Sequence, residues 1–159
     1  MIKVGDQIPS MKLMKATAEG PKEVSTDEIF KGRKVVLFAV PGAFTPTCSM
    51  NHMPGFVAAA DAIKAKGVDT IACTSVNDVH VMNAWAKASG ADSKILMLAD
   101  GNAAFAKAVG LDKDLAVAGM GVRSSRYSMI VDDGVVKTLN VEEKSGVNVS
   151  GAETILEQL

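Results

Sequence analysis

Short apolar runs alternate with helical segments through the middle of the chain, and this alternation constrains the fold more than any other feature. The runs are rich in β-branched and aromatic residues, which is typical of buried strands. They span residues 35–40, 70–76 and 95–98, and each is followed by a signal for a helix start. Repeated strand–helix units predict an α/β domain with right-handed crossovers.

The last third of the chain predicts a change of strand direction. Runs at 128–131 and 135–139 flank Asp132-Asp133-Gly134, which is a strong hairpin signal. Capping boxes at 25–28 and 150–153 predict a short early helix and a final helix. Residues 1–14 are expected to be short extended pieces, and 111–125 to be irregular. The prediction is one domain over 1–159, with a mixed central sheet flanked by helices and an extended N-terminal segment.

Cys48 occupies a special place after the first long strand. Thr45 is a good N-cap residue, and Pro46 then falls at the first helical position, which puts Cys48 at the third. Unpaired N–H groups and the helix dipole at this position favour a thiolate over a thiol. A kink or break is expected at Pro54 and Gly55. A buried structural cysteine is the alternative interpretation at this point.

Composition excludes several classes of function. The chain has 159 residues, a formal net charge of −1 and a pI near 6.1, so neither nucleic acid nor an anionic membrane is an expected partner. No apolar run approaches the length of a membrane span, and the first residues show no signal-peptide pattern, so a cytoplasmic location is expected. Two cysteines and two histidines are too few for a disulfide scaffold or a clustered metal site. No metal or cofactor is therefore expected.

The cysteine segment resembles a known signature. Pro41-Gly42-Ala43-Phe44-Thr45-Pro46-Thr47-Cys48 is similar to the Pro-x-x-x-Thr-x-x-Cys motif of peroxiredoxins. The longer run through His52-Met53-Pro54-Gly55-Phe56 resembles the type II peroxiredoxins, also called the peroxiredoxin-five group. Similar segments follow in the same order, at 75–78, 98–100, 126–129 and 139–142. The resemblance implies a thioredoxin-like fold and commonly a homodimer.

The resemblance also implies an active site. Cys48 would be the nucleophile that attacks a hydroperoxide and becomes a sulfenic acid. Pro41 would shield the thiolate from water, and the hydroxyl of Thr45 would face both the sulfur and the peroxide. The backbone N–H groups of Thr47 and Cys48 would donate to peroxide oxygens. Arg126 aligns with the active-site arginine of the family and would stabilise the developing charge.

Two further residues receive lesser roles. Arg123 belongs to a Gly-x-Arg motif and is assigned a supporting role. Phe44 is a candidate for the substrate pocket and for a dimer contact, although burial in the loop would explain it equally well.

Recycling of the sulfenic acid depends on Cys73. This residue matches a cysteine found in plant-like members of the group, and it is either a resolving cysteine or a core residue within a strand; the core role is favoured. The chain has neither a further cysteine near its C-terminus nor a Cys-x-x-Cys motif. An external thiol is therefore the expected reductant, with glutathione and glutaredoxin favoured over thioredoxin.

Three other functions fit the sequence less well. A thioredoxin-fold binding protein or chaperone would not require Pro41, Thr45, Cys48 and Arg126 together. A thiol–disulfide oxidoreductase would need the absent Cys-x-x-Cys motif. A cysteine–histidine hydrolase could use His52, one helical turn after Cys48, but no orienting partner is evident, so surface or packing roles are expected for His52 and His80.

Overall fold

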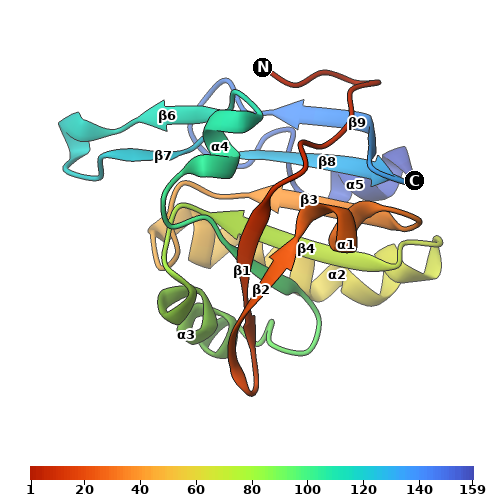
Figure 1. The fold of residues 1–159 in the computed structure, drawn as a ribbon, viewed down its shortest axis with the longest axis horizontal. Coiled ribbons are helices and arrows are strands. Elements are labelled where there is room, and N and C mark those ends of the chain that lie inside the picture. Colours follow the sequence, from red (N-terminus) through yellow and green to blue (C-terminus); the bar gives the residue numbers. More distant parts are fainter.

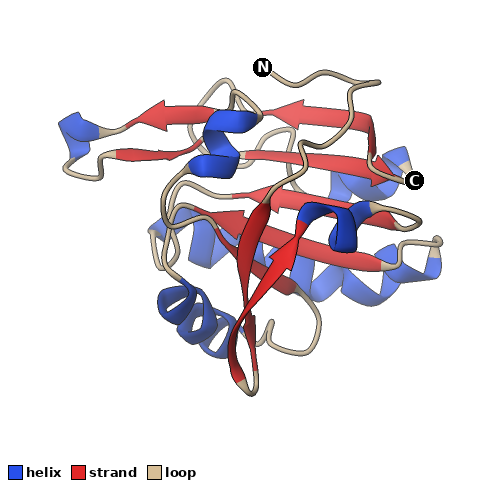
Figure 2. Cartoon of the chain, viewed as in Figure 1, coloured by secondary structure: helices blue, strands red, loops and turns tan.

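A seven-stranded mixed sheet forms the centre of the molecule. The computed structural model describes residues 1–159, and the order of strands in the sheet is β2-β1-β5-β4-β3-β8-β9 (Figures 1 and 2). The strands span Lys12–Thr17 (β1), Gly20–Ser25 (β2), Lys34–Ala39 (β3), Thr70–Ser75 (β4), Leu96–Ala99 (β5), Tyr127–Asp132 (β8) and Val135–Val141 (β9).

Parallel and antiparallel pairings divide this sheet. The strands β3, β4 and β5 run parallel, whereas β8 pairs antiparallel with β3 and β1 pairs antiparallel with β5. Asp133 and Gly134 make the β8–β9 turn at φ values of 49° and 78°, as the sequence predicts for such a hairpin. The predicted thioredoxin-like α/β fold is confirmed.

Helices cover both faces of the sheet. They span Thr26–Phe30 (α1), Met53–Ala65 (α2), Val79–Ser89 (α3), Ala104–Ala108 (α4) and Ala152–Gln158 (α5). One core contains residues of α2, α3 and α5, and the other contains residues of α1 and α4. In Figure 1, α1 and α4 lie in front of the sheet, and α2 and α5 lie behind it.

The central strand β3 supplies side chains to both cores. Val36 and Phe38 point into the first core, and Val35 and Leu37 point into the second. This follows from the two-residue period of a strand, and it explains why the run is apolar throughout rather than alternating. The segment that carries Cys48 follows directly after this central strand.

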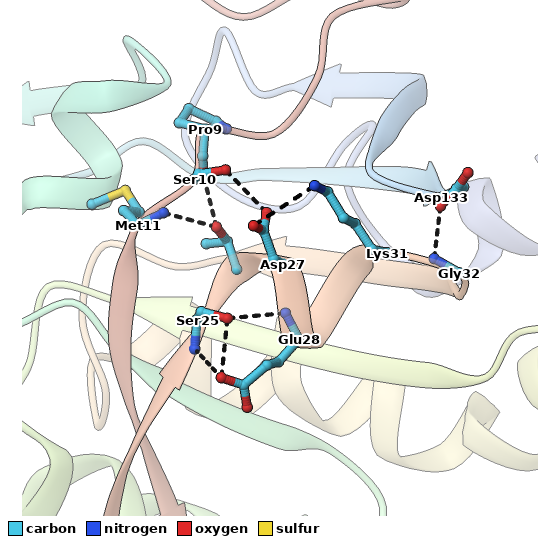
Figure 3. Close-up of polar contacts among 10 residues, drawn as sticks. Pro9, Ser10, Met11, Ser25, Asp27, Glu28, Lys31, Gly32 and Asp133 are labelled. Carbon is cyan, nitrogen blue, oxygen red and sulfur yellow. Dashed lines mark hydrogen bonds and ion pairs between the residues drawn. The ribbon is translucent and has the colours of Figure 1, made fainter.

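The N-terminal part contains a hairpin that the sequence did not predict. The strands β1 and β2 pair along their whole length and lead directly into α1. The predicted capping box is present: the Ser25 hydroxyl accepts a hydrogen bond from Glu28 N–H at 3.1 Å, and the Glu28 carboxylate accepts one from Ser25 N–H (Figure 3).

Contacts with distant segments hold α1 in place. Ser10 donates a hydrogen bond to Asp27 at 3.0 Å, and Lys31 lies 3.7 Å from the same carboxylate (Figure 3). At the end of the helix, Gly32 N–H donates to Asp133 of the β8–β9 turn at 2.7 Å. These contacts tie the N-terminal hairpin to the far edge of the sheet.

The helix that follows Cys48 differs from the expected broken helix. Residues 48–52 form a π-helical turn, η1 (Cys48–His52), in which Met53 N–H donates to the Cys48 carbonyl. The helix α2 then continues without a break to Ala65, with Pro54 in its first turn. Pro54 closely follows the π-helical turn, so the change from π to α geometry falls beside the residue whose missing N–H interrupts the backbone hydrogen bonds. No break occurs at Pro54 or Gly55, although a kink or break was expected there.

Two other local predictions need correction. The stretch 111–125 is more regular than expected: it forms a small hairpin of β6 (Asp112–Asp114) and β7 (Val122–Ser124), joined through the 3-10 helix η2 (Ala116–Ala118). Ser150 does not cap the last helix, because Gly151 occupies the N-cap position and the Ser150 hydroxyl donates to Glu142 instead. None of the helices combines the length and the apolar character that crossing a membrane requires.

Candidate active site

Cys48 lies in the first turn of the helix that follows β3. Residues 46 and 47 are helical, and the first backbone hydrogen bond of the helix runs from Ser49 N–H to the Thr45 carbonyl at 2.9 Å. Thr45 and Pro46 therefore occupy the predicted positions, and the N–H groups of Thr47 and Cys48 lie in the first turn, where helix geometry provides no partner. The Cys48 side chain is completely buried.

Arg126 contacts the sulfur of Cys48 directly. Its Nη2 atom donates to Cys48 Sγ at 3.0 Å. The sheet explains this contact: Ala39 at the end of β3 pairs with Tyr127 at the start of β8, so Arg126 lies just beyond the same edge as Cys48. A guanidinium at this distance stabilises negative charge on the sulfur and, during attack, on the departing oxygen.

The Thr45 side chain makes a different contact from that of an N-cap. Its hydroxyl donates to the Gly42 carbonyl at 2.7 Å, and no hydrogen bond joins the N–H of Cys48 to its oxygen. Gly42 has little room: a Cβ atom there would lie 3.1 Å from Thr45 Cγ2 and 3.3 Å from Arg123 Nη1. The loop after β3 is thus tightly folded, with Thr45 fixed by the chain's own backbone.

Arg123 braces this loop and does not bond to Cys48. Its Nε donates to the Met120 carbonyl at 2.9 Å, and its Nη1 donates to the Val76 carbonyl at 3.2 Å. Asn77 adds a second brace, because its side-chain oxygen accepts the N–H of Ala43 at 2.9 Å. The supporting role predicted for Arg123 is therefore, in this structure, a structural link between three loops.

Phe44 lies at the surface of the same loop. Its φ is 63°, a left-handed conformation that is rare for a bulky residue, and its side chain is 54% exposed. Strained conformations of this kind concentrate at functional sites.

His52 is buried, which agrees with the packing role expected from sequence and excludes the surface role, and it is also bonded to Arg126. Arg126 Nη1 lies 2.9 Å from its Nδ1, and its Nε2 lies 2.8 Å from the Ser150 carbonyl. Because Arg126 can only donate and the carbonyl can only accept, the ring must be neutral with its proton on Nε2.

The surroundings of His52 keep the imidazole uncharged. Burial lowers the pKa of His52 from 6.5 to about 4; the Ser150 carbonyl and Glu142 oppose this change, and the charge of Arg126 adds to it. The ring also packs against Phe38 and Phe56, with centroids 5.0 and 5.6 Å away. The one sequence signal for this role was the spacing of one helical turn between Cys48 and His52.

Glu142 is a second residue that sequence reasoning missed. Its Oε2 accepts the backbone N–H groups of Asn148, Val149 and Ser150, each at 2.8 Å, and the Ser150 hydroxyl at 2.6 Å. Burial alone would raise the pKa of this carboxyl, but these hydrogen bonds lower it overall. Glu142 thereby fixes the loop whose Ser150 carbonyl holds His52.

A polar cleft of about 340 Å³ opens beside Arg126. No hydrophobic residue lines it. Two lysines, Lys113 and Lys144, stand on its wall without an ion-pair partner. The remaining lining residues are Pro41, Thr47, Ser125, Arg126, Glu142, Glu143, Ser145 and Gly146.

Cys73 is buried in β4 and is not bonded to Cys48. Both cysteines are free, and both belong to the same core. Burial raises the pKa of the Cys73 thiol, and the neighbouring Cys48 adds to the rise. Nowhere do three or more His, Cys, Asp or Glu side chains converge closely enough to hold a metal ion.

Comparisons with known proteins show which family the chain resembles. The Redoxin family model matches residues 3–156. Peroxiredoxin-2E-2, chloroplastic, of Oryza sativa subsp. japonica is 50% identical over 99% of this chain and 72% of its own length. Peroxiredoxin-2C of the same plant is 46% identical, over 99% of this chain and 98% of its own.

Solved structures show the same fold. Reduced Prx3 from Vibrio vulnificus in complex with hydrogen peroxide is 56% identical, with a TM-score of 0.95 over 99% of each chain. The 1-Cys peroxiredoxin of Plasmodium falciparum, described as an antioxidant protein, is 29% identical, with a TM-score of 0.92 over 99% of this chain and 98% of that one.

The thioredoxin-like fold and the similarity to peroxiredoxins over nearly the whole chain define a thiol-dependent peroxidase as the class of protein. Within that class, the chain belongs to the Redoxin family and is a peroxiredoxin.

Proposed function

We propose that the protein reduces hydrogen peroxide and alkyl hydroperoxides at Cys48. The thiolate attacks the near peroxide oxygen, the O–O bond breaks, and the far oxygen leaves with a proton as water or an alcohol. Cys48 becomes a sulfenic acid, which holds the oxygen it has gained. The contact of 3.0 Å between Arg126 Nη2 and Cys48 Sγ carries this proposal.

The surrounding groups favour an in-line attack in this mechanism. Arg126 supplies positive charge beside both the sulfur and the oxygen that leaves. The N–H groups of Thr47 and Cys48 donate to the peroxide, and the Thr45 hydroxyl, whose proton is donated to the Gly42 carbonyl, is left as an acceptor for it. Fixed dipoles of this kind stabilise developing charge without having to reorganise.

A test of this reaction compares the wild-type protein with Cys48→Ser and Cys73→Ala. Each is mixed with hydrogen peroxide, and sulfenic acid formation is followed by mass spectrometry after trapping. Oxidation of Cys48 in the wild type and Cys73→Ala proteins, but none at residue 48 in Cys48→Ser, is expected. A peroxidase rate in Cys48→Ser equal to that of the wild type would refute the assignment.

We further propose that an external thiol, rather than Cys73, reduces the sulfenic acid. Complete burial and a raised pKa make Cys73 a poor nucleophile. A disulfide would also require Cys48 to leave its helical turn. The core role of Cys73 is therefore favoured.

Glutathione, delivered directly or through glutaredoxin, is the favoured reductant. The cleft beside Arg126 is polar and presents Lys113 and Lys144 together with two glutamates, Glu142 and Glu143. A cleft with both signs of charge suits a small peptide thiol that carries an ammonium group and free carboxylates. Thioredoxin is the alternative. Steady-state assays with each reducing system separate the two: Lys113→Ala with Lys144→Ala should raise the KM for the glutathione system and leave that for thioredoxin unchanged.

The subgroup, assembly and location are proposed together. The type II subgroup is proposed because the resemblance to it includes the segment that contains His52. A homodimer is proposed because it would cover Phe44 and Met50, whose side chains are 54% and 81% exposed beside the site. Analytical ultracentrifugation of the wild type and Phe44→Glu tests the dimer. A reducing compartment, such as the cytoplasm, suits two free thiols.

A further inference from the structure

His52 is bonded on both sides by groups that fix its protonation. Arg126 Nη1 donates to Nδ1 at 2.9 Å, and Nε2–H donates to the Ser150 carbonyl at 2.8 Å. The same guanidinium uses its other terminal nitrogen, Nη2, for Cys48 Sγ. The plane of the Arg126 side chain is therefore set by one neutral acceptor, the imidazole, and by the sulfur.

Arg126 has no acidic partner. The ion pairs of the protein join lysines to Asp or Glu in each case, and none involves an arginine. Glu142, which lines the same cleft as Arg126, uses its Oε2 to accept hydrogen bonds from the backbone N–H groups of residues 148–150 and from the Ser150 hydroxyl. The positive charge of Arg126 thus faces Cys48 without a compensating carboxylate.

We propose that His52 is a positioning residue whose neutral Nδ1 aims the Arg126 guanidinium at Cys48 while leaving its charge uncompensated. The inference rests on the proposed peroxidase role of Cys48. An aspartate or glutamate in place of His52 would hold the guanidinium equally well, but it would offset the charge that stabilises the thiolate. A neutral imidazole supplies the orientation alone.

Glu142 extends this arrangement outward. By binding the N–H groups of residues 148–150, it fixes the direction of the Ser150 carbonyl, which in turn selects the Nε2–H form of the ring. The charged and titratable groups that face His52 are Cys48 on its own helical turn, Arg126 at the start of β8 and Glu142 after β9. Arg126 disfavours a second proton on the ring, and the favourable effect of Glu142 is too small to offset burial.

Asparagine and aspartate provide a matched test at residue 52. Both have nearly the same shape and can accept from Arg126 near the position of Nδ1, but only aspartate brings a negative charge. His52→Leu removes the acceptor altogether, and His80→Asn serves as the control because His80 is exposed. All variants are made in a Cys73→Ala background so that Cys48 is the only thiol.

The first readout is alkylation of Cys48 by iodoacetamide across pH, which measures thiolate without any peroxide. We expect the alkylation profile of His52→Asn to stay close to that of the parent. The midpoint of the profile of His52→Asp should move upward by about 1 to 2 pH units, because a nearby negative charge disfavours the thiolate. His52→Leu should lower the rate at neutral pH about tenfold, the effect of losing one hydrogen bond to a charged group. Circular dichroism confirms that each variant is folded.

The second readout is the rate of peroxide reduction by the same proteins. It should fall in the order parent, His52→Asn, His52→Asp. Equal alkylation profiles for the Asn and Asp variants, or a Leu variant that matches its parent, would overturn the inference. An alkylation pattern as expected, together with a parent protein inert toward peroxide, would overturn the proposed function and leave the role of His52 intact.

Discussion

Acid will destabilise the folded protein through His52, and the size of the effect follows from its burial. In the folded chain the pKa of His52 is about 4, against 6.5 when unfolded. Between these values the unfolded chain binds a proton that the folded chain does not, so the stability is fully present above pH 6.5 and is lost as pH falls toward 4. At about 1.4 kcal/mol for each pH unit, the loss is about 3 kcal/mol.

Urea unfolding of the wild type and His52→Asn, at about pH 7 and about pH 4, measures this contribution. Asparagine does not titrate, so the variant lacks the loss due to residue 52. The carboxyls, including Glu142, are common to both proteins and cancel in the difference. The difference in the free energy of unfolding between the wild type and His52→Asn should therefore shrink by about 3 kcal/mol when the pH is lowered.

His80→Asn is the matched control, because His80 is exposed. The difference in the free energy of unfolding between His80→Asn and the wild type should change little between the two pH values. If the corresponding difference for His52→Asn also stays constant, the reasoning is refuted, because the ring would then bind its proton equally well in the folded and unfolded chains.

Three other perturbations test the packing around the site. Gly42→Ala places a Cβ 3.1 Å from Thr45 Cγ2; it should slow the reaction of Cys48 with peroxide and cost about 1 kcal/mol of stability in urea unfolding. Trp85 Nε1 donates to the Ser49 hydroxyl at 3.0 Å, so oxidation of the adjacent cysteine should change the tryptophan fluorescence, and Ser49→Ala should abolish much of that change. Asp100 accepts two backbone N–H groups at the start of α4; Asp100→Ala should lower the thermal midpoint, with a loss of about 1–2 kcal/mol.

Sequence reasoning succeeded where a short-range rule decides the structure. The apolar run of β3, the turn at Asp133 and Gly134, and the helix start at Thr45 and Pro46 are each set by neighbouring residues. The alignment of Arg126 with a family pattern also anticipated its contact with Cys48. These parts follow from local propensity together with one distant pairing of strands.

Long-range contacts account for the residues that were missed. His52 was assigned to the surface or to packing because no neighbouring residue indicates its contacts with Arg126 and Ser150, which lie 74 and 98 residues later in the sequence. Ser150 matched a capping box, but Glu142 offered its hydroxyl a stronger partner. The hairpin of β1 and β2 escaped prediction because each of its strands has only one buried residue and carries little apolar alternation.

The π turn of residues 48–52 separates the Cys48 sulfur from the rest of its helix. Because α2 begins only at Met53, the turn can unwind and draw the sulfur out of the first core while α2 stays wound. The sulfur has no exposed surface in the wound form, so a bulky thiol reaches it only when the turn opens. The frequency of that opening would then govern how readily a reductant restores the protein.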